Sequence, residues 1–218
     1  MHHFGAIIFD MDGLLLDTER VHLDTFNASC LELGLGDLSE LYKQCIGRDY
    51  PSTRDILQKG LQKHIDYEAF CVVWQHYYDR ETHNGCVPLK AGAIDLLNAI
   101  KNVKTPMAVA TSTAHDQALQ RLQSAGIAHY FDHVIGGDQV KQGKPNPEIY
   151  LQAASLLGYP PAQCLALEDS HNGVIAALTA GMTVVQIPDL VEPDDTLLAM
   201  GHIVLENLSA VLGYPFRG

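Results

Sequence analysis

The chain has 218 residues, of which 47% are hydrophobic, enough to bury the core of one large domain or of a domain with an insert. Its formal net charge of −12 disfavours nucleic acid and anionic membranes as partners, because both bind lysine and arginine. The five scattered cysteines form no CxxC pair and no apolar run is long enough to span a membrane, so we expect reduced thiols and a cytoplasmic location.

The first predicted element is a buried strand, 6–9, that runs directly into two carboxylates, Asp10 and Asp12. Like charges at this spacing repel one another unless a cation or a proton intervenes. Taken alone, the pair also fits an ordinary acidic surface loop. Its meaning therefore depends on which other residues the fold brings to the end of this strand.

A long helical segment follows the first strand. Residues 18–85 contain apolar residues at helical spacing and no convincing strand, and the segment is too long for a loop inside a compact domain. We therefore predict an all-helical domain at 18–85, inserted into a domain formed by residues 1–17 and 86–218. Such an insert would lie over the carboxyl ends of the strands, where open α/β sheets bind ligands.

Beyond the insert, short apolar strands alternate with helical patterns that end near glycines. This alternation predicts an α/β fold, a Rossmann-like parallel sheet with helices on both faces. The predicted strands lie within 106–112, 133–138, 164–170, 183–189 and 202–208.

Two of these strands end, like the first, on residues that can carry chemistry. Thr111 and Ser112 follow one strand, and Glu168 and Asp169 end another. Because the carboxyl ends of parallel strands lie along one edge of a sheet, we expect these residues to meet the aspartates of the first strand. Four carboxylates at one edge make an oxygen-rich pocket that suits Mg²⁺.

The same edge can hold a phosphoryl group. Thr111 and Ser112 offer hydroxyl and N–H groups ahead of a helix that we expect to begin near His115, and Lys144 can supply a positive charge. Separately, a Thr–Ser pair is often a helix cap and a single lysine is usually solvated. Together these parts predict phosphoryl transfer, with Asp10 as nucleophile and Asp12 as acid/base.

Four segments of the chain resemble the motifs of the haloacid dehalogenase-like hydrolases: FDMDGLLLDT, ATST, GKPNPEIY and LEDSHNGV, in that order. The resemblance covers the chain from Phe9 to about Asp189. The helical insert resembles the cap domain of the beta-phosphoglucomutase-like branch. Members of that branch are mostly magnesium-dependent phosphatases of small phosphate monoesters, many of them sugar phosphates.

The resemblance implies a role for each matching residue. Asp10 would be the nucleophile and a magnesium ligand, and Asp12 would be the acid/base and would ligate magnesium through its carbonyl. The phosphoryl group would be held by Thr111, Ser112 and Lys144.

The remaining metal positions follow from the last of the four motifs. Asp169 would bind magnesium, with Glu168 as a direct or water-mediated partner. Gly13 would permit the tight path of the chain after the acid/base.

Other positions match the mutase of this branch only in part. Thr18 and His22 match residues that flank its hinge and orient its acid/base, although His22 also fits a helix-surface histidine. Gly47 matches its cap glycine, but the serine–arginine pattern that grips a second phosphate is not evident. Ala114 and His115 stand where the mutase carries a lysine.

These departures favour hydrolysis. The leading prediction is a magnesium-dependent phosphatase of a small phosphorylated metabolite, with a beta-phosphoglucomutase-like isomerase as the alternative. A phosphorylated signalling receiver is disfavoured, because receivers are about half this length and have no helical insert. We expect a monomer, hinged near Asp17–Thr18 and 85–87.

Overall fold

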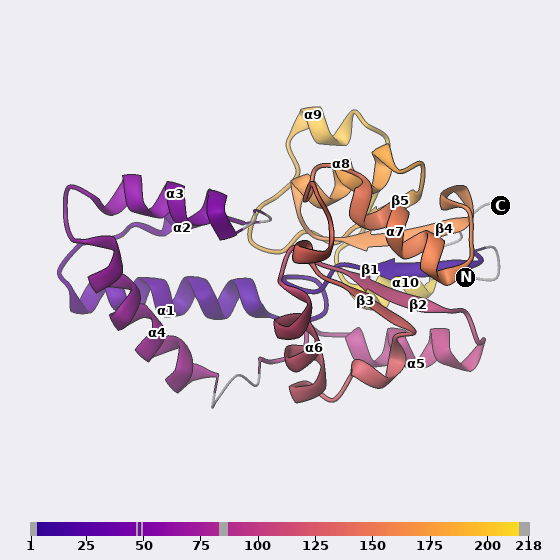
Figure 1. Cartoon of the computed structure of the whole chain (residues 1–218), viewed down its shortest axis with the longest axis horizontal. Helices are drawn as coiled ribbons and strands as arrows, with labels where there is room; N and C mark the ends of the chain where they lie inside the picture. Colours follow the sequence, from indigo (N-terminus) through magenta and orange to yellow (C-terminus); the bar gives the residue numbers. More distant parts are fainter. Residues whose placement is uncertain (1–3, 47, 49, 83–86, 214–218) are drawn as a thin grey trace.

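The computed structural model describes residues 4–46, 48, 50–82 and 87–213. It contains a six-stranded sheet in the order β3-β2-β1-β4-β5-β6, in which all neighbouring strands are parallel (Figure 1). The predicted α/β class is confirmed. The first strand has its predicted bounds, and the other five are present but shorter than their expected segments. The strands are β1 Ala6–Phe9, β2 Met107–Ala110, β3 His133–Ile135, β4 Cys164–Glu168, β5 Thr183–Gln186 and β6 Ile203–Val204.

Helices cover both faces of the sheet, because the side chains of each strand alternate between two apolar clusters. In β1, Ile7 and Phe9 belong to one cluster, and Ala6 and Ile8 belong to the other. The first cluster includes residues of α5 (Ala93–Asn102), α6 (His115–Ser124) and α10 (Leu208–Gly213). The second includes residues of α7 (Glu148–Leu157), α8 (His171–Thr179) and α9 (Asp195–Leu198). Figure 1 shows α7 and α8 on the opposite side of the sheet from α5.

The helical insert has a hydrophobic core of its own, built around Phe26, Leu57, Phe70 and neighbouring residues. It lies to one side of the sheet domain, beyond the end of β1 (Figure 1). The helix α1 begins at Thr18, at the predicted start of the insert, whereas its predicted end at 85/86 lies outside the described residues. The helices are α1 Thr18–Glu32, α2 Ser39–Lys43, α3 Tyr50–Leu61 and α4 Tyr67–Glu81.

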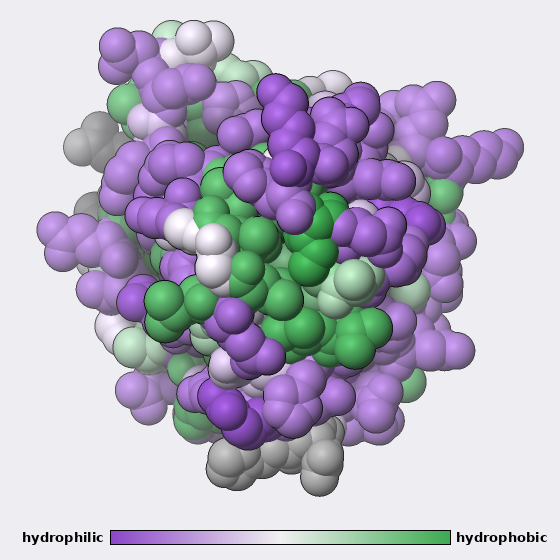
Figure 2. Space-filling model, turned by 90° about the vertical axis from the view of Figure 1, so that its left-hand side faces the viewer, coloured by the Kyte–Doolittle hydropathy of each residue, from purple (hydrophilic) through white to green (hydrophobic). Residues whose placement is uncertain are grey.

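The outer face of the insert carries apolar side chains, which appear as a green area in Figure 2. Leu31 on α1 and Val72 on α4 are 82% and 72% exposed. Within the described part of the chain, no helix has both the length and the hydrophobicity that a membrane span requires.

Candidate active site

The ends of three neighbouring strands bring the predicted site residues together. In the sheet, Phe9 of β1 pairs with Val109 of β2 on one side and with Leu167 of β4 on the other. The residues that follow these positions therefore meet at one edge, as the sequence predicts. The resulting group is almost completely buried and consists of Asp10, Thr111, Glu168 and Asp169.

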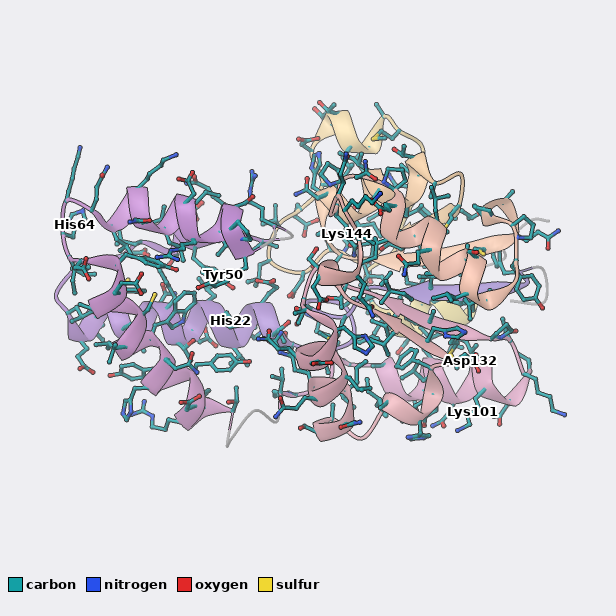
Figure 3. The ribbon with its side chains drawn as sticks, in the orientation of Figure 1. His22, Tyr50, His64, Lys101, Asp132 and Lys144 are labelled. Carbon is teal, nitrogen blue, oxygen red and sulfur yellow. The ribbon has the colours of Figure 1, made fainter. Side chains whose placement is uncertain are left out.

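Lys144 lies between two of the carboxylates. It comes from the loop before α7, and its side chain is 2% exposed (Figure 3). Its Nζ lies 2.5 Å from Asp10 Oδ1 and 2.5 Å from Glu168 Oε1. Burial lowers the pKa of Lys144, but the two carboxylates raise it more, so the lysine stays charged. This lysine compensates part of the negative charge that the strand ends concentrate.

Both carboxylate oxygens of Glu168 are occupied by donors. Tyr150 donates its hydroxyl to Oε1 at 2.8 Å, alongside Lys144. The backbone N–H groups of Asp169 and Ser170 donate to Oε2 at 3.0 and 2.9 Å, and the Ser170 hydroxyl does so at 3.1 Å. Glu168 therefore holds Lys144 in place, and the sequence motif gave no indication of Tyr150 as its partner.

The carboxylate of Asp12 is held on both of its oxygens. Arg121, on α6, contacts Oδ1 through Nη1 at 2.8 Å. The hydroxyls of Thr113 and Thr111 donate to Oδ2 at 2.7 and 3.3 Å. Burial raises the pKa of Asp12, but Arg121 and then Thr113 lower it more, so the pKa lies below its ordinary value. Neither Arg121 nor Thr113 was expected from the sequence.

The remaining predicted residues lie around this centre. Thr18, the first residue of α1, accepts a hydrogen bond on Oγ1 from the backbone N–H of Gly13 at 3.1 Å. His22 stacks on Tyr78, and burial together with Arg121 lowers its pKa to about 4, so the imidazole is neutral.

For two other predicted positions, Ser112 and Gly47, the structure gives no side-chain contact in the site. Ser112 follows Thr111 at a bend after β2 and is half-buried. Gly47 lies outside the described residues.

Asp10 and Asp169 fit a cation. Burial raises the pKa of Asp10 to about 8, against the opposing effect of Lys144. Burial, and then the charges of Glu168 and Asp10, raise the pKa of Asp169 well above its ordinary value. Asp169 Oδ1 is buried and no hydrogen-bond donor among the described residues reaches it. A positive charge at this point would remove the repulsion that the raised pKa values express.

The side chains alone do not form a complete metal cage. Among residues 4–46, 48, 50–82 and 87–213, no three His, Cys, Asp or Glu side chains converge in a metal-binding arrangement. Lys144 forms an ion pair with Glu168, and Arg121 forms one with the carboxylate of Asp12, so neither carboxylate is free to bind a metal ion. A cation held by two carboxylates must complete its coordination with backbone oxygens, water or substrate, which is the usual pattern for Mg²⁺.

The insert contributes one wall of a pocket beside Asp169. The pocket has a volume of about 440 Å³ and is also lined by the segment that follows β5. From the insert, its walls include Lys43, Ile46 and Arg48. Of the carboxylate cluster, the pocket is lined by Asp169 and not by Asp10, Thr111 or Glu168.

Comparison with known proteins supports a hydrolytic site. A family model described as haloacid dehalogenase-like hydrolase matches residues 7–187. A phosphorylated carbohydrates phosphatase of Thermotoga maritima is 33% identical over 177 residues, which cover 81% of this chain and 82% of that protein. The fructose-1-phosphate phosphatase of Escherichia coli is 30% identical over 190 residues, covering 84% and 96%. A hydrolase structure from Deinococcus radiodurans with bound phosphate and sodium superposes with a TM-score of 0.78 at 26% identity, covering 96% and 93%.

Proposed function

The chain belongs to the haloacid dehalogenase-like hydrolase family, and we propose that it is a magnesium-dependent phosphatase of small phosphate monoesters, in particular sugar phosphates. The observation that carries this proposal is the arrangement at the strand ends. A buried lysine holds Asp10 by one oxygen, and the carboxylate of Asp12 lies two residues further along the chain beside Thr111. These are the parts that phosphoryl transfer through an aspartyl phosphate requires.

In this mechanism the two aspartates act in sequence. The oxygen of Asp10 that Lys144 does not hold attacks phosphorus. Asp12, whose lowered pKa means that it must first take up a proton from solvent, donates that proton to the oxygen of the leaving alcohol. The ionised Asp12 then accepts a proton from a water molecule, which attacks the aspartyl phosphate and releases inorganic phosphate. Thr111, Ser112 and Lys144 hold the phosphoryl oxygens during both steps, and Glu168 holds the lysine.

Mg²⁺ fits the two buried carboxylates of Asp10 and Asp169, with the carbonyl of Asp12 as a further ligand. When bound, the ion supplies positive charge that offsets the repulsion between the carboxylates and the phosphate dianion. We propose that Glu168 contributes through Lys144 and through water, because donors within the protein occupy both of its oxygens.

Two observations support a sugar phosphate as the substrate. The relatives from Thermotoga maritima and Escherichia coli are named for phosphorylated carbohydrates and fructose 1-phosphate. The pocket of about 440 Å³ borders the carboxylate cluster at Asp169 alone, and its size suits a small molecule.

The test is phosphate release from a panel of phosphate monoesters with Mg²⁺, for the wild type and for Asp10→Asn in parallel. The panel contains hexose, deoxyhexose and pentose phosphates, nucleotides and phosphoglycolate. We expect the wild type to release phosphate and the variant to be slower by about 10³-fold or more, because the nucleophile is lost. Isomerisation of β-glucose 1-phosphate with a bisphosphate primer, in place of phosphate release, would overturn the proposal in favour of a mutase.

A further inference from the structure

Glu19 is an acidic side chain of the insert that lies beside the catalytic carboxylates. It is the second residue of α1, directly after Thr18. A Cβ atom placed on Gly13 would lie 3.2 Å from Glu19 Cγ and 2.4 Å from Asp169 Oδ2. Glu19 and Asp169 therefore border the same glycine, and the insert places its own carboxylate beside the proposed phosphate site.

Within the part of the chain that the structure describes, a hydrogen-bond donor reaches one oxygen of this carboxylate. Tyr42 donates its hydroxyl to Glu19 Oε2 at 2.8 Å. Among the described residues no donor reaches Oε1, and the Glu19 residue is only partly buried. Glu19 is thus a fixed hydrogen-bond acceptor with one oxygen left for a ligand in the active site.

Tyr42 fixes the direction of this acceptor. The tyrosine is 4% exposed and packs against the rings of Phe26 and Trp74, with centroids 5.5 and 5.9 Å away. A tyrosine held on two sides has little freedom to turn its hydroxyl away from Glu19. The core of the insert therefore determines where Glu19 Oε1 is presented.

We propose that Glu19 is a specificity-determining residue that accepts a hydrogen bond from a hydroxyl group of the leaving alcohol; this rests on the proposed phosphatase function. Gly13, which borders Glu19, directly follows Asp12, the residue that would protonate the ester oxygen, so the acceptor lies close to the leaving group. A carboxylate close to Asp12, Asp169 and Asp189 disfavours an anionic group. A neutral hydroxyl donates a hydrogen bond to it, as polyols can and simple alkyl alcohols cannot.

Two phosphate esters of three-carbon alcohols test this assignment. The alcohol of sn-glycerol 3-phosphate carries free hydroxyl groups, whereas that of propyl phosphate carries none. We expect the wild type to prefer the glycerol ester in kcat/KM by on the order of 10- to 100-fold, the effect of one hydrogen bond to a charged group. Glu19→Met, which removes both oxygens at similar volume, lowers this ratio to about 1. Glu19→Gln, which retains one acceptor oxygen, gives an intermediate ratio.

The insert contains a matched control for this pair. At the other end of α1, Tyr77 donates its hydroxyl to Glu32 Oε2 at 2.7 Å, and this pair is exposed. Glu32→Met and Glu32→Gln repeat the same chemical changes away from the site, and we expect the ratio of the two esters to stay at its wild-type value. Tyr42→Phe, which retains the ring packing, lowers the ratio because Glu19 loses its fixed direction.

The outcomes separate this inference from the proposed function. Equal losses on both esters in Glu19→Met would overturn the specificity role and indicate a structural one. A raised Mg²⁺ requirement with an unchanged ratio would instead make Glu19 part of the metal site. A wild type that shows no preference between the esters overturns the inference while leaving the phosphatase intact, whereas no phosphate release from any ester of the panel removes the phosphatase itself.

Discussion

Gly173, in the first turn of α8, leaves the space that Glu168 occupies. A Cβ atom at this position would lie 1.7 Å from Glu168 Oε1, closer than any non-bonded contact allows. The carboxylate cannot move aside at low cost, because Lys144, Tyr150 and the backbone after β4 hold it. The position of Lys144 therefore depends on the absence of a side chain at Gly173.

Gly173→Ala is expected to displace Glu168 and, with it, Lys144. We predict a loss of at least about 100-fold in kcat and a decrease of about 1–3 kcal/mol in the free energy of unfolding, because the buried site is overpacked. Gly143→Ala is the matched control, since nothing lies within 4 Å of a Cβ placed there. Chemical denaturation and phosphate release measure the two effects, and a fully active Gly173→Ala protein would contradict this account of Glu168.

Arg121 is expected to act as a positioning residue for Asp12, whose Oδ1 it contacts at 2.8 Å. Without it the carboxylate can rotate away from the ester oxygen, so proton donation suffers. Arg121→Met should therefore slow hydrolysis of alkyl phosphates by about 10- to 100-fold and that of p-nitrophenyl phosphate, whose leaving group needs no proton, much less. Arg121→Lys should restore part of the rate, and Arg20→Met, at an exposed arginine, serves as the control. The same loss on both esters would argue against this role.

The residues that the sequence predicts and those that it misses differ in one respect. Asp10, Thr111 and Lys144 stand at the ends of strands or before a helix, so the fold class alone brings them together. Arg121 and Tyr150 lie within helices whose apolar patterns give no sign of a polar contact. The partner of Arg121 is more than 100 residues away along the chain. Such contacts depend on how helices are placed against the sheet, which local patterns do not encode.

At the scale of elements, Lys90 joins the start of the insert to the segment that follows β5. Its Nζ lies 3.3 Å from Asp17 Oδ1, just before α1, and 2.5 Å from Asp189 Oδ1. Lys90 is 19% exposed and Asp189 is 2% exposed, so this ion pair is largely withdrawn from water. Because the loop of Asp189 also lines the pocket, the lysine connects the pocket to one of the two chain crossings into the insert.

Lys90→Met is expected to leave Asp189 as a buried charge without a counter-ion. We predict that the free energy of unfolding falls by about 3 kcal/mol, the usual cost of breaking a buried pair on one side. Lys59→Met, which breaks an exposed pair with Asp55, should cost less than about 1 kcal/mol. Denaturant titration measures both, and the double variant Lys90→Met/Asp189→Asn should recover part of the loss. Equal small effects of the two single variants would contradict the buried pair.

The elements themselves were predicted with uneven success, for a physical reason. The strands and the longer helices, such as α1 and α4, repeat apolar residues often enough for their period to be recognised. The four-residue helix α9 and the short turns η1 (Ala128–Tyr130), η2 (Gly137–Gln139) and η3 (Pro161–Gln163) complete too few periods to leave a pattern. Apart from β1, the strands also end earlier than predicted, because the expected segments included residues of the following loops, such as Thr111, Ser112 and Asp169.

At the scale of the whole molecule, the chain is acidic, and several of its carboxyl groups are buried together in the candidate active site. Asp10, Asp169 and Glu19 lie together with raised pKa values, chiefly because burial disfavours their charged forms. Burial raises the pKa of Asp10 to about 8 and that of Glu19 to about 7. In the unfolded chain these carboxyl groups ionise near their ordinary values, 3.8 for Asp and 4.5 for Glu. At a pH between the ordinary pKa and the raised pKa of each group, the folded protein therefore binds more protons than the unfolded chain.

This difference predicts that the metal-free protein loses stability as the pH rises from 6.5 to 8.5. Because the folded state holds the extra protons, the free energy of unfolding falls with pH, by about 2 kcal/mol for a group such as Asp10 over this interval. His22 does not obscure the effect: burial lowers its pKa to about 4, so its opposite contribution lies below pH 6.5, the ordinary value for histidine. Thermal unfolding in the presence of a chelator measures the slope.

Mg²⁺ should reverse this dependence, since we propose that it binds the ionised carboxylates, which only the folded protein brings together. We expect the ion to raise Tm more at pH 8.5 than at pH 6.5, and to do so less in Asp169→Asn, which lacks one of the two ligand carboxylates. Glu32→Gln, at an exposed carboxylate, should respond like the wild type. If Mg²⁺ shifted Tm equally at both pH values and in Asp169→Asn, the buried carboxylates would not be its binding site, and the charge repulsion at the strand ends would have to be compensated by protons and by Lys144 alone.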